Sequence, residues 1–243
     1  MQPVQAPSPN FDARALPISM IVLHYTGMET GEAALARLRD PEAKVSAHYL
    51  VEEDGTVFAL VDEDKRAWHA GRSHWRGIKD VNSASIGIEI VNPGHEFGYR
   101  DFPEAQVHAV IRLVAAIKDR YSITRGNVVG HSDIAPTRKK DPGELFPWWS
   151  LSRLRLALPR PTRGLMDPHW NEASFLLALE RFGYDVEEPR AAIRAFQRRF
   201  RPEMIDGEMD AGAWSCGMVI DGEMDAECRM ILLALLLPQP QGD

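Results

Sequence analysis

The sequence predicts an α/β protein in which helices flank a central mixed β-sheet, followed by a small C-terminal domain of three helices. Apolar runs that end in polar residues or glycine alternate with helical patterns between residues 18 and 130. The composition then changes, and the part of the chain after residue 168 shows only helical periodicity. We therefore expect an arm at 1–17, a main domain at 18–157, a linker at 158–168 and a helical domain at 169–238.

Composition limits the classes of partner. The chain has 243 residues, of which 44% are hydrophobic and 26% charged, and its net charge is −7. No apolar run approaches the roughly 20 residues that a membrane span needs. An acidic chain without a basic run is not expected to bind nucleic acid or an anionic membrane. Cys216 and Cys228 are too few for a disulfide framework. A glycan or a small substrate of mixed charge fits better.

The first 17 residues predict either a disordered arm or one clamped onto the domain. They contain neither the basic start nor the apolar core of a secretory signal. On this ground the expected location is the cytoplasm, with the periplasm as the alternative if a leader has been removed.

The segment 18–27 predicts a strand buried on both faces, because Ile21, Val22 and Leu23 form a continuous apolar run. His24 then lies at the carboxyl end of the strand, where α/β sheets often hold ligands and catalytic groups. A hydrogen-bonded core histidine is the alternative. Residues 30–40 predict a short helix with Thr30 as its N-cap.

Residues 45–51 and 56–61 predict a β-hairpin that turns at Asp54-Gly55. His48 lies inside its first strand, and we interpret it as structural. The Trp-His-Ala-Gly run at 68–71 and the polar loop that follows predict the wall of a groove, although aromatic residues that only pack are the alternative.

Residues 85–91 predict a strand with three isoleucines on one face and Glu89 on the other. An unpaired buried carboxylate is costly, so Glu89 requires a partner such as a lysine or a water held by a metal. The alternative is an edge strand with one wet face. Residues 103–121 form the clearest helix, with Val107, Val110, Ile111, Val114 and Ile117 in one stripe that covers the sheet.

A short strand at 127–130 leads to His131, and the segment 130–143, which proline and glycine frame, predicts a loop. It contains His131, Asp141 and Lys139. An imidazole and a carboxylate are ligands that Zn²⁺ accepts, and a further ligand must come from elsewhere in the chain. Taken alone, this spacing is more typical of a surface histidine and a solvated aspartate than of a metal site.

These motifs together resemble a known family. They comprise Ile-Val-Leu-His at 21–24, Ser-Ala-His-Tyr at 46–49, Trp-His-Ala-Gly at 68–71, Ser-Ile-Gly-Ile-Glu-Ile-Val-Asn at 85–92, Gly-His-Ser-Asp-Ile-Ala-Pro at 130–136 and Lys-Lys-Asp-Pro-Gly at 139–143. Their order is that of zinc-dependent N-acetylmuramoyl-L-alanine amidases of the AmpD/AmiD type, and the resemblance covers about 18–156. It implies that His24, His131 and Asp141 bind Zn²⁺, that Glu89 is the catalytic acid and that Lys139 is the catalytic lysine.

The resemblance also implies a muropeptide or peptidoglycan-fragment substrate and a groove that includes Tyr25, Trp68, His69, Asn82 and Ser85. Related enzymes carry a tyrosine and a cysteine where this chain has Ala47 and Asp141, which indicates the branch that uses two histidines, an aspartate and a glutamate. We expect cleavage of the amide between the lactyl group of N-acetylmuramic acid and L-alanine, in the recycling of 1,6-anhydro-muropeptides. The alternatives are an envelope amidase that acts on peptidoglycan and a recognition module without catalysis.

The C-terminal part resembles a three-helix peptidoglycan-binding module through its Ala-Phe-Gln run at 195–197, with helices expected near 175–184, 190–200 and 226–237. A helical domain that only packs is the alternative. The heptapeptide Ile-Asp-Gly-Glu-Met-Asp-Ala occurs at 205–211 and again at 220–226, which indicates a duplication. We expect 211–220, with Trp214 and Cys216, to be an inserted loop. Deletion of 206–220, which restores one copy of the heptapeptide, should leave folding and activity nearly unchanged.

Overall fold

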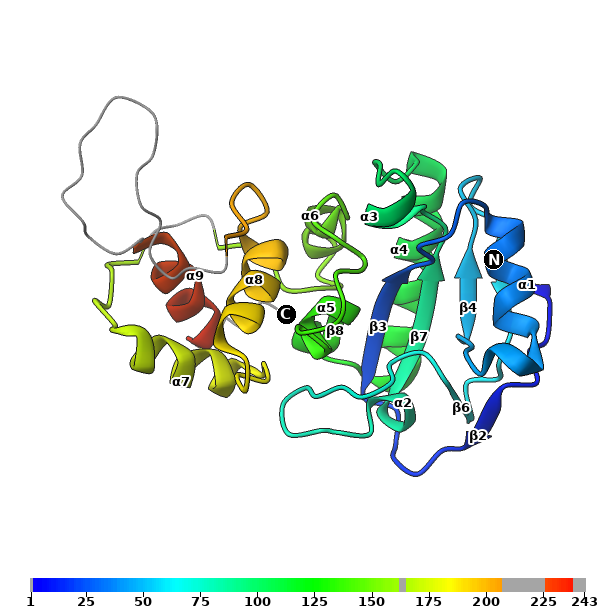
Figure 1. Cartoon of the computed structure of the whole chain (residues 1–243), viewed down its shortest axis with the longest axis horizontal. Coiled ribbons are helices and arrows are strands. Elements are labelled where there is room, and N and C mark those ends of the chain that lie inside the picture. The colour runs from blue at the N-terminus through cyan, green and yellow to red at the C-terminus, as the bar shows by residue number, and fades with distance from the viewer. Residues whose placement is uncertain (1, 162–164, 207–225, 238–243) are drawn as a thin grey trace.

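The computed structural model describes residues 2–161, 165–206 and 226–237. Its main feature is a six-stranded mixed sheet, as the sequence predicts (Figure 1). The strand order is β1-β5-β4-β7-β3-β8, with parallel neighbours except for the antiparallel pair β4 and β5. These strands are β1 (Val4–Gln5), β3 (Met20–Tyr25), β4 (Tyr49–Val51), β5 (Val57–Ala59), β7 (Ser85–Ile90) and β8 (Val128–Gly130).

The N-terminal arm is clamped onto the domain. Strand β1 pairs with β5, and β2 (Phe11–Ala13) pairs antiparallel with β6 (Lys65–Ala67) in a second, two-stranded sheet. The Arg14 guanidinium donates to the carbonyls of Ser85 and Glu63, at 3.0 and 2.9 Å. The arm is therefore tied to the amino end of β7.

The predicted hairpin is present, but its first strand is shorter than the expected 45–51. Strand β4 begins at Tyr49, and His48 lies just before it. The His48 side chain accepts a hydrogen bond from the backbone N–H of Gly87 at 2.9 Å, and its backbone bonds with Gly87 and Leu60. His48 is fully buried and serves to join the hairpin to β7.

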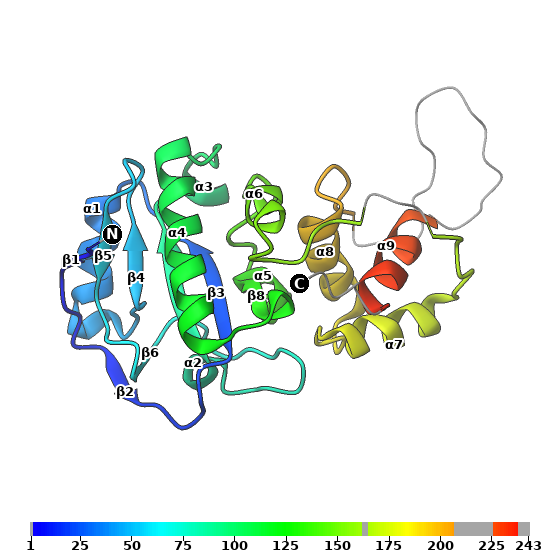
Figure 2. The same ribbon diagram turned by 180° about the vertical axis from the view of Figure 1, so that it is seen from behind.

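Strand β7 lies in the middle of the sheet, between β4 and β3. The alternative in which Glu89 sits on an edge strand is therefore wrong. Ile86, Ile88 and Ile90 pack in one apolar cluster with the buried side of α4 (Glu104–Tyr121), which covers this face of the sheet (Figure 2). Burial of this apolar stripe holds the helix against the sheet.

The remaining helices of this part are short. Thr30 is the N-cap of helix α1 (Gly31–Arg39), and its side-chain oxygen accepts from the backbone N–H of Ala33. The segment after His131 is not wholly a loop as expected, because its first residues form the single turn α5. The other short elements are η1 (Pro41–Ala43), α2 (Val81–Ala84), α3 (Gly94–Phe97), η2 (Arg125–Asn127), α5 (His131–Ile134) and α6 (Trp148–Arg153).

Three helices follow: α7 (Glu172–Phe182), α8 (Pro189–Phe200) and α9 (Ala226–Leu236). They lie beside α5 and the β8 edge of the sheet (Figure 1). One apolar cluster runs from Phe175 and Phe196 in these helices to Met20, Val22 and Val129 in the sheet. The predicted inserted loop at 211–220 lies outside the described residues. No described helix has the length and apolar character needed to cross a membrane.

A buried polar contact reinforces this junction. The hydroxyl of Tyr184 donates to Asp133 Oδ1 at 2.7 Å, and Asp133 Oδ2 accepts from the N–H of Gly130 at 2.8 Å. Burial raises the pKa of Asp133. The contact links the helical part to the turn that begins with His131.

We predict that Tyr184→Phe lowers the free energy of unfolding by about 1–3 kcal/mol, because it keeps the ring packing but leaves a buried carboxyl group without one donor. Urea titration followed by tryptophan fluorescence measures the change. Tyr121→Phe is the matched control, since its hydroxyl donates to the partly buried Glu63 at 2.7 Å. The control should cost less than about 1 kcal/mol, and equal losses in the two variants would contradict the prediction.

Candidate metal centre

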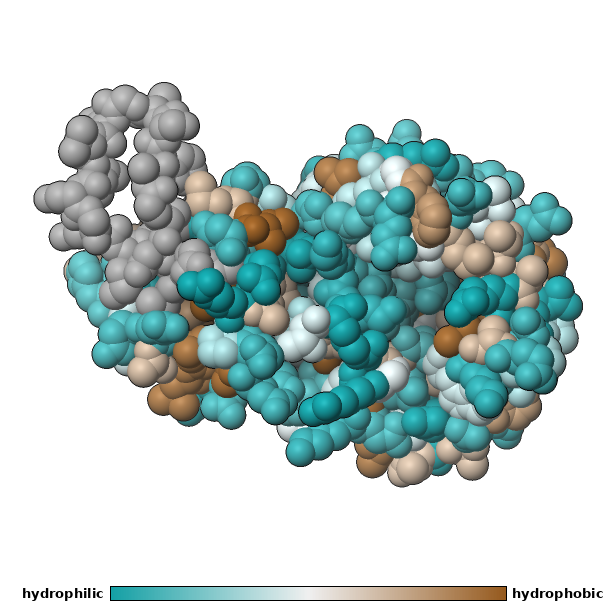
Figure 3. All heavy atoms as spheres, in the orientation of Figure 1, coloured by the Kyte–Doolittle hydropathy of each residue, from teal (hydrophilic) through white to brown (hydrophobic). Residues whose placement is uncertain are grey.

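The candidate site lies on the face of the sheet opposite α4, at the carboxyl ends of β3 and β7. The two strands pair in register, with His24 opposite Glu89. Side chains alternate between the two faces along a strand. The neighbours of His24 and Glu89 in these strands, Leu23, Ile88 and Ile90, pack in the apolar cluster on the α4 face. Both polar side chains therefore point to the other face, which is mainly hydrophilic in Figure 3. A cavity of about 420 Å³ opens there.

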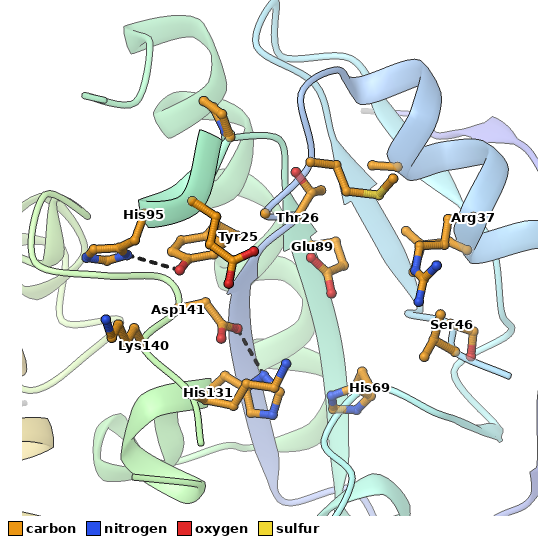
Figure 4. A pocket seen from close by; sticks show the side chains of 18 of the residues that line it. Tyr25, Thr26, Arg37, Ser46, His69, Glu89, His95, His131, Lys140 and Asp141 are labelled. Carbon is orange, nitrogen blue, oxygen red and sulfur yellow. Dashed lines mark hydrogen bonds and ion pairs between the residues drawn. The ribbon is translucent and has the colours of Figure 1, made fainter. Parts of the chain in front are cut away.

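Three side-chain atoms from distant parts of the chain converge at this cavity, on His24, His131 and Asp141; Figure 4 shows the last two side chains facing each other. Asp141 Oδ2 lies 3.1 Å from His24 Nδ1 and 2.9 Å from His131 Nδ1, and the two Nδ1 atoms are 2.9 Å apart. All three residues are buried. Among the described residues, they form the group of histidine, cysteine and acidic side chains that could hold a metal ion.

The protonation states of His24, His131 and Asp141 suit the binding of a cation between them. His131 Nε2 lies 3.1 Å from the carbonyl of Ala70, which can only accept, so Nε2 carries the proton and Nδ1 offers a lone pair. Burial, and then the neighbouring His131, lower the pKa of His24 to about 4. Although burial opposes it, the two histidines hold the pKa of Asp141 below its usual range. Electron-pair donors at this separation repel one another unless a cation lies between them.

Glu89 and Lys139 line the same cavity. Glu89 Oε2 is buried and has no hydrogen-bond partner within the described part of the chain. Burial, and then the charge of Asp141, raise the pKa of Glu89 well above its ordinary value, while Lys139 opposes the rise. A carboxyl group in this state can hold a proton close to the three converging atoms.

The predicted groove residues do not all line the cavity. Tyr25, Trp68 and His69 do. Asn82 lies beneath it, where its Oδ1 accepts from the backbone N–H groups of His69 and Ala70. Ser85 is fully buried and contacts His69. The last two therefore support the cavity wall rather than form its surface.

Several cavity residues carry no signal in the sequence. Arg37 extends from α1 toward the cavity, and His95 lies on α3 beside Tyr25 (Figure 4). His95 Nδ1 is 3.0 Å from the Tyr25 hydroxyl, and its Nε2 is 3.0 Å from Glu144. Only the packing of α1 and α3 at the end of the sheet brings these side chains to the site.

The family model for N-acetylmuramoyl-L-alanine amidase matches residues 14–144. The chain is 41% identical over 220 residues to the N-acetylmuramoyl-L-alanine amidase AmiD of Escherichia coli, covering 80% of this chain and 79% of the relative. It is 36% identical over 178 residues to the 1,6-anhydro-N-acetylmuramyl-L-alanine amidase AmpD of the same organism, covering 65% of this chain and 93% of AmpD.

Among solved structures, the chain is similar to E. coli AmiD in complex with the substrate anhydro-N-acetylmuramic acid-L-Ala-D-γ-Glu-L-Lys. The TM-score is 0.75 at 37% identity, and the match covers 93% of this chain and 91% of AmiD. With the family match, the sequence identity over most of both chains and the shared fold, the protein belongs to the N-acetylmuramoyl-L-alanine amidase family.

Proposed function

We propose that this chain hydrolyses the amide between the lactyl group of N-acetylmuramic acid and L-alanine, in 1,6-anhydro-muropeptides, with Zn²⁺ held by His24, His131 and Asp141. The observation that carries the proposal is the convergence of these three buried side chains within 3.1 Å of one another. Ligand atoms about 2.0–2.1 Å from one tetrahedral zinc ion lie about 3.3 Å apart, which is close to this spacing. Three protein ligands are typical of a catalytic zinc site.

A bound zinc ion supplies Lewis-acid polarisation of the carbonyl and lowers the pKa of the attacking water. Glu89, whose raised pKa suits proton transfer, takes a proton from that water as its oxygen attacks the carbonyl carbon. The same carboxyl group then gives the proton to the alanine nitrogen as the C–N bond breaks. Lys139 donates to the carbonyl oxygen as negative charge develops on it.

We predict that His24→Ala or Asp141→Ala abolishes stoichiometric zinc binding, because two remaining ligands do not form a stable site. Metal content after gel filtration measures the effect. His95→Ala is the control, since His95 lines the same cavity but lies outside the ligand group. Chelation of the parent protein should remove its activity, and added Zn²⁺ should restore it. Retention of one zinc ion per chain in Asp141→Ala would refute the ligand assignment.

We predict that Glu89→Gln keeps zinc and lowers kcat by about 10²–10⁴-fold, because the amide keeps the shape of the side chain but cannot carry the proton. Release of the stem peptide from a 1,6-anhydro-muropeptide, followed by mass spectrometry, gives the rate. Glu96→Gln is the matched control, because Glu96 is an exposed carboxylate at the same cavity. A Glu89→Gln enzyme with parental turnover and bound metal would exclude this role.

Two relatives support the substrate class: AmpD is named a 1,6-anhydro-N-acetylmuramyl-L-alanine amidase, and AmiD was solved with an anhydro-N-acetylmuramic acid peptide. We propose that the chain acts on such fragments in the cytoplasm, in peptidoglycan recycling. Cell fractionation tests the location, and recovery of the protein only from the periplasm would contradict it.

An envelope amidase is the second candidate. We propose that 18–157 is the catalytic domain, 158–168 a linker and 169–238 a peptidoglycan-binding-like domain, and the similarity to AmiD, which extends over 93% of this chain, supports this division. The C-terminal helices favour the envelope because an enzyme in the cytoplasm meets no polymeric cell wall to bind.

The two candidates make different predictions for substrate preference. A recycling enzyme should cleave a soluble 1,6-anhydro-muropeptide at least ten times faster, in kcat/KM, than stem peptides on isolated sacculi. Assay of both substrates with one preparation decides between them, and a preference for sacculi would favour the envelope.

A further inference from the structure

We infer that His69 and Ser85 form a hydrogen-bond relay that fixes the tautomer of His24 and so presents its Nδ1 lone pair to the metal site. Both are positioning residues, because they act through His24 and not on the substrate. The inference rests on the proposed zinc site and adds residues that the ligand set does not include.

The relay begins at Ser85, whose single hydroxyl proton has one defined partner. Ser85 Oγ lies 2.6 Å from the carbonyl oxygen of Val81, which can only accept, so Ser85 donates there. In the contact of 3.2 Å between Ser85 Oγ and His69 Nε2, the ring N–H is therefore the donor and the hydroxyl oxygen the acceptor. Nε2 of His69 therefore carries the proton.

The next step fixes the ring of His24. A neutral imidazole has one protonated nitrogen, so His69 Nδ1 is an acceptor. It lies 3.0 Å from His24 Nε2, which must donate the proton of this hydrogen bond. Nδ1 of His24 is then unprotonated, and this is the atom that faces Asp141 and His131. A second ring nitrogen that donates to a fixed acceptor is the usual means of orienting a histidine ligand.

The backbone holds the relay in place. Ser85 is the C-cap of α2 and the first residue of β7, which brings its hydroxyl to the carbonyl of Val81 in the helix. The backbone N–H of His69 donates to Asn82 at 3.1 Å. The ring of His69 lies against Gly87, where a Cβ atom would overlap it. The missing side chain at position 87 therefore makes room for the ring between the sheet and the cavity.

Removal of the Ser85 hydroxyl leaves His69 Nε2 without an acceptor. The His69 tautomer with its proton on Nδ1 is then no longer disfavoured. In that tautomer, His69 Nδ1 donates a hydrogen bond to His24 Nε2. His24 must in turn carry its own proton on Nδ1, where it blocks ligation. The variant should therefore weaken metal binding without touching a ligand.

The test compares Ser85→Ala with Ser83→Ala in the full chain. Ser83 is also fully buried, and its hydroxyl accepts from the N–H of Ala15 at 3.2 Å, but it lies outside the relay. Competition with a zinc-binding dye should show a dissociation constant raised about 10–100-fold in Ser85→Ala and less than about threefold in Ser83→Ala. Equal affinities of the two variants would overturn the inference while leaving the zinc site intact. Failure of the parent chain to bind zinc would overturn both.

A second measurement reads the tautomers directly. Long-range ¹H–¹⁵N correlation spectra of the parent protein should show His69 and His24 protonated at Nε2. His69 protonated at Nδ1 would overturn the inference, even if Ser85→Ala lowered the zinc affinity by another route.

Discussion

The parallel pairing of β3 with β7 is the constraint on which the site depends. The register sets His24 beside Glu89 on one face of the sheet, while the isoleucines of β7 and the buried side of α4 occupy the other. A shift by one residue would turn either polar side chain into the apolar layer. The cost of burying a polar side chain there keeps the register fixed, so the same apolar packing that stabilises the sheet also aligns His24 with Glu89.

The site also depends on contacts beyond the sheet. His131 opens a single-turn helix, and a four-residue helix has little stability of its own. Its turn is held by Asp133, which caps Gly130 on one side and accepts from Tyr184 on the other. The C-terminal part thus supports the turn that carries His131, through Tyr184 after α7. One role of this part of the chain is therefore to stabilise the turn that begins at His131.

Much of this arrangement could be predicted from the sequence because the strong signals are local. The buried run before His24, the stripe of α4 and the Asp-Gly turn each follow from patterns within about 20 residues, and the structure confirms the mixed sheet that they imply. The prediction that His24 and Asp141, 117 residues apart, lie together came from the family resemblance and not from periodicity. The roles of Asn82 and Ser85 beneath the cavity and the presence of Arg37 at its wall depend on tertiary packing, which leaves no mark on short windows of sequence.

The contact between Gly87 and the ring of His69 has a consequence for how this fold can vary. The space above position 87 is already filled by an imidazole whose two ring nitrogens are both hydrogen-bonded. A chain that gains a side chain at this position must move or replace that ring, and a chain that loses the ring gains a void that a larger residue can fill. Positions 69 and 87 should therefore change together during divergence, as a pair linked by volume and not by charge.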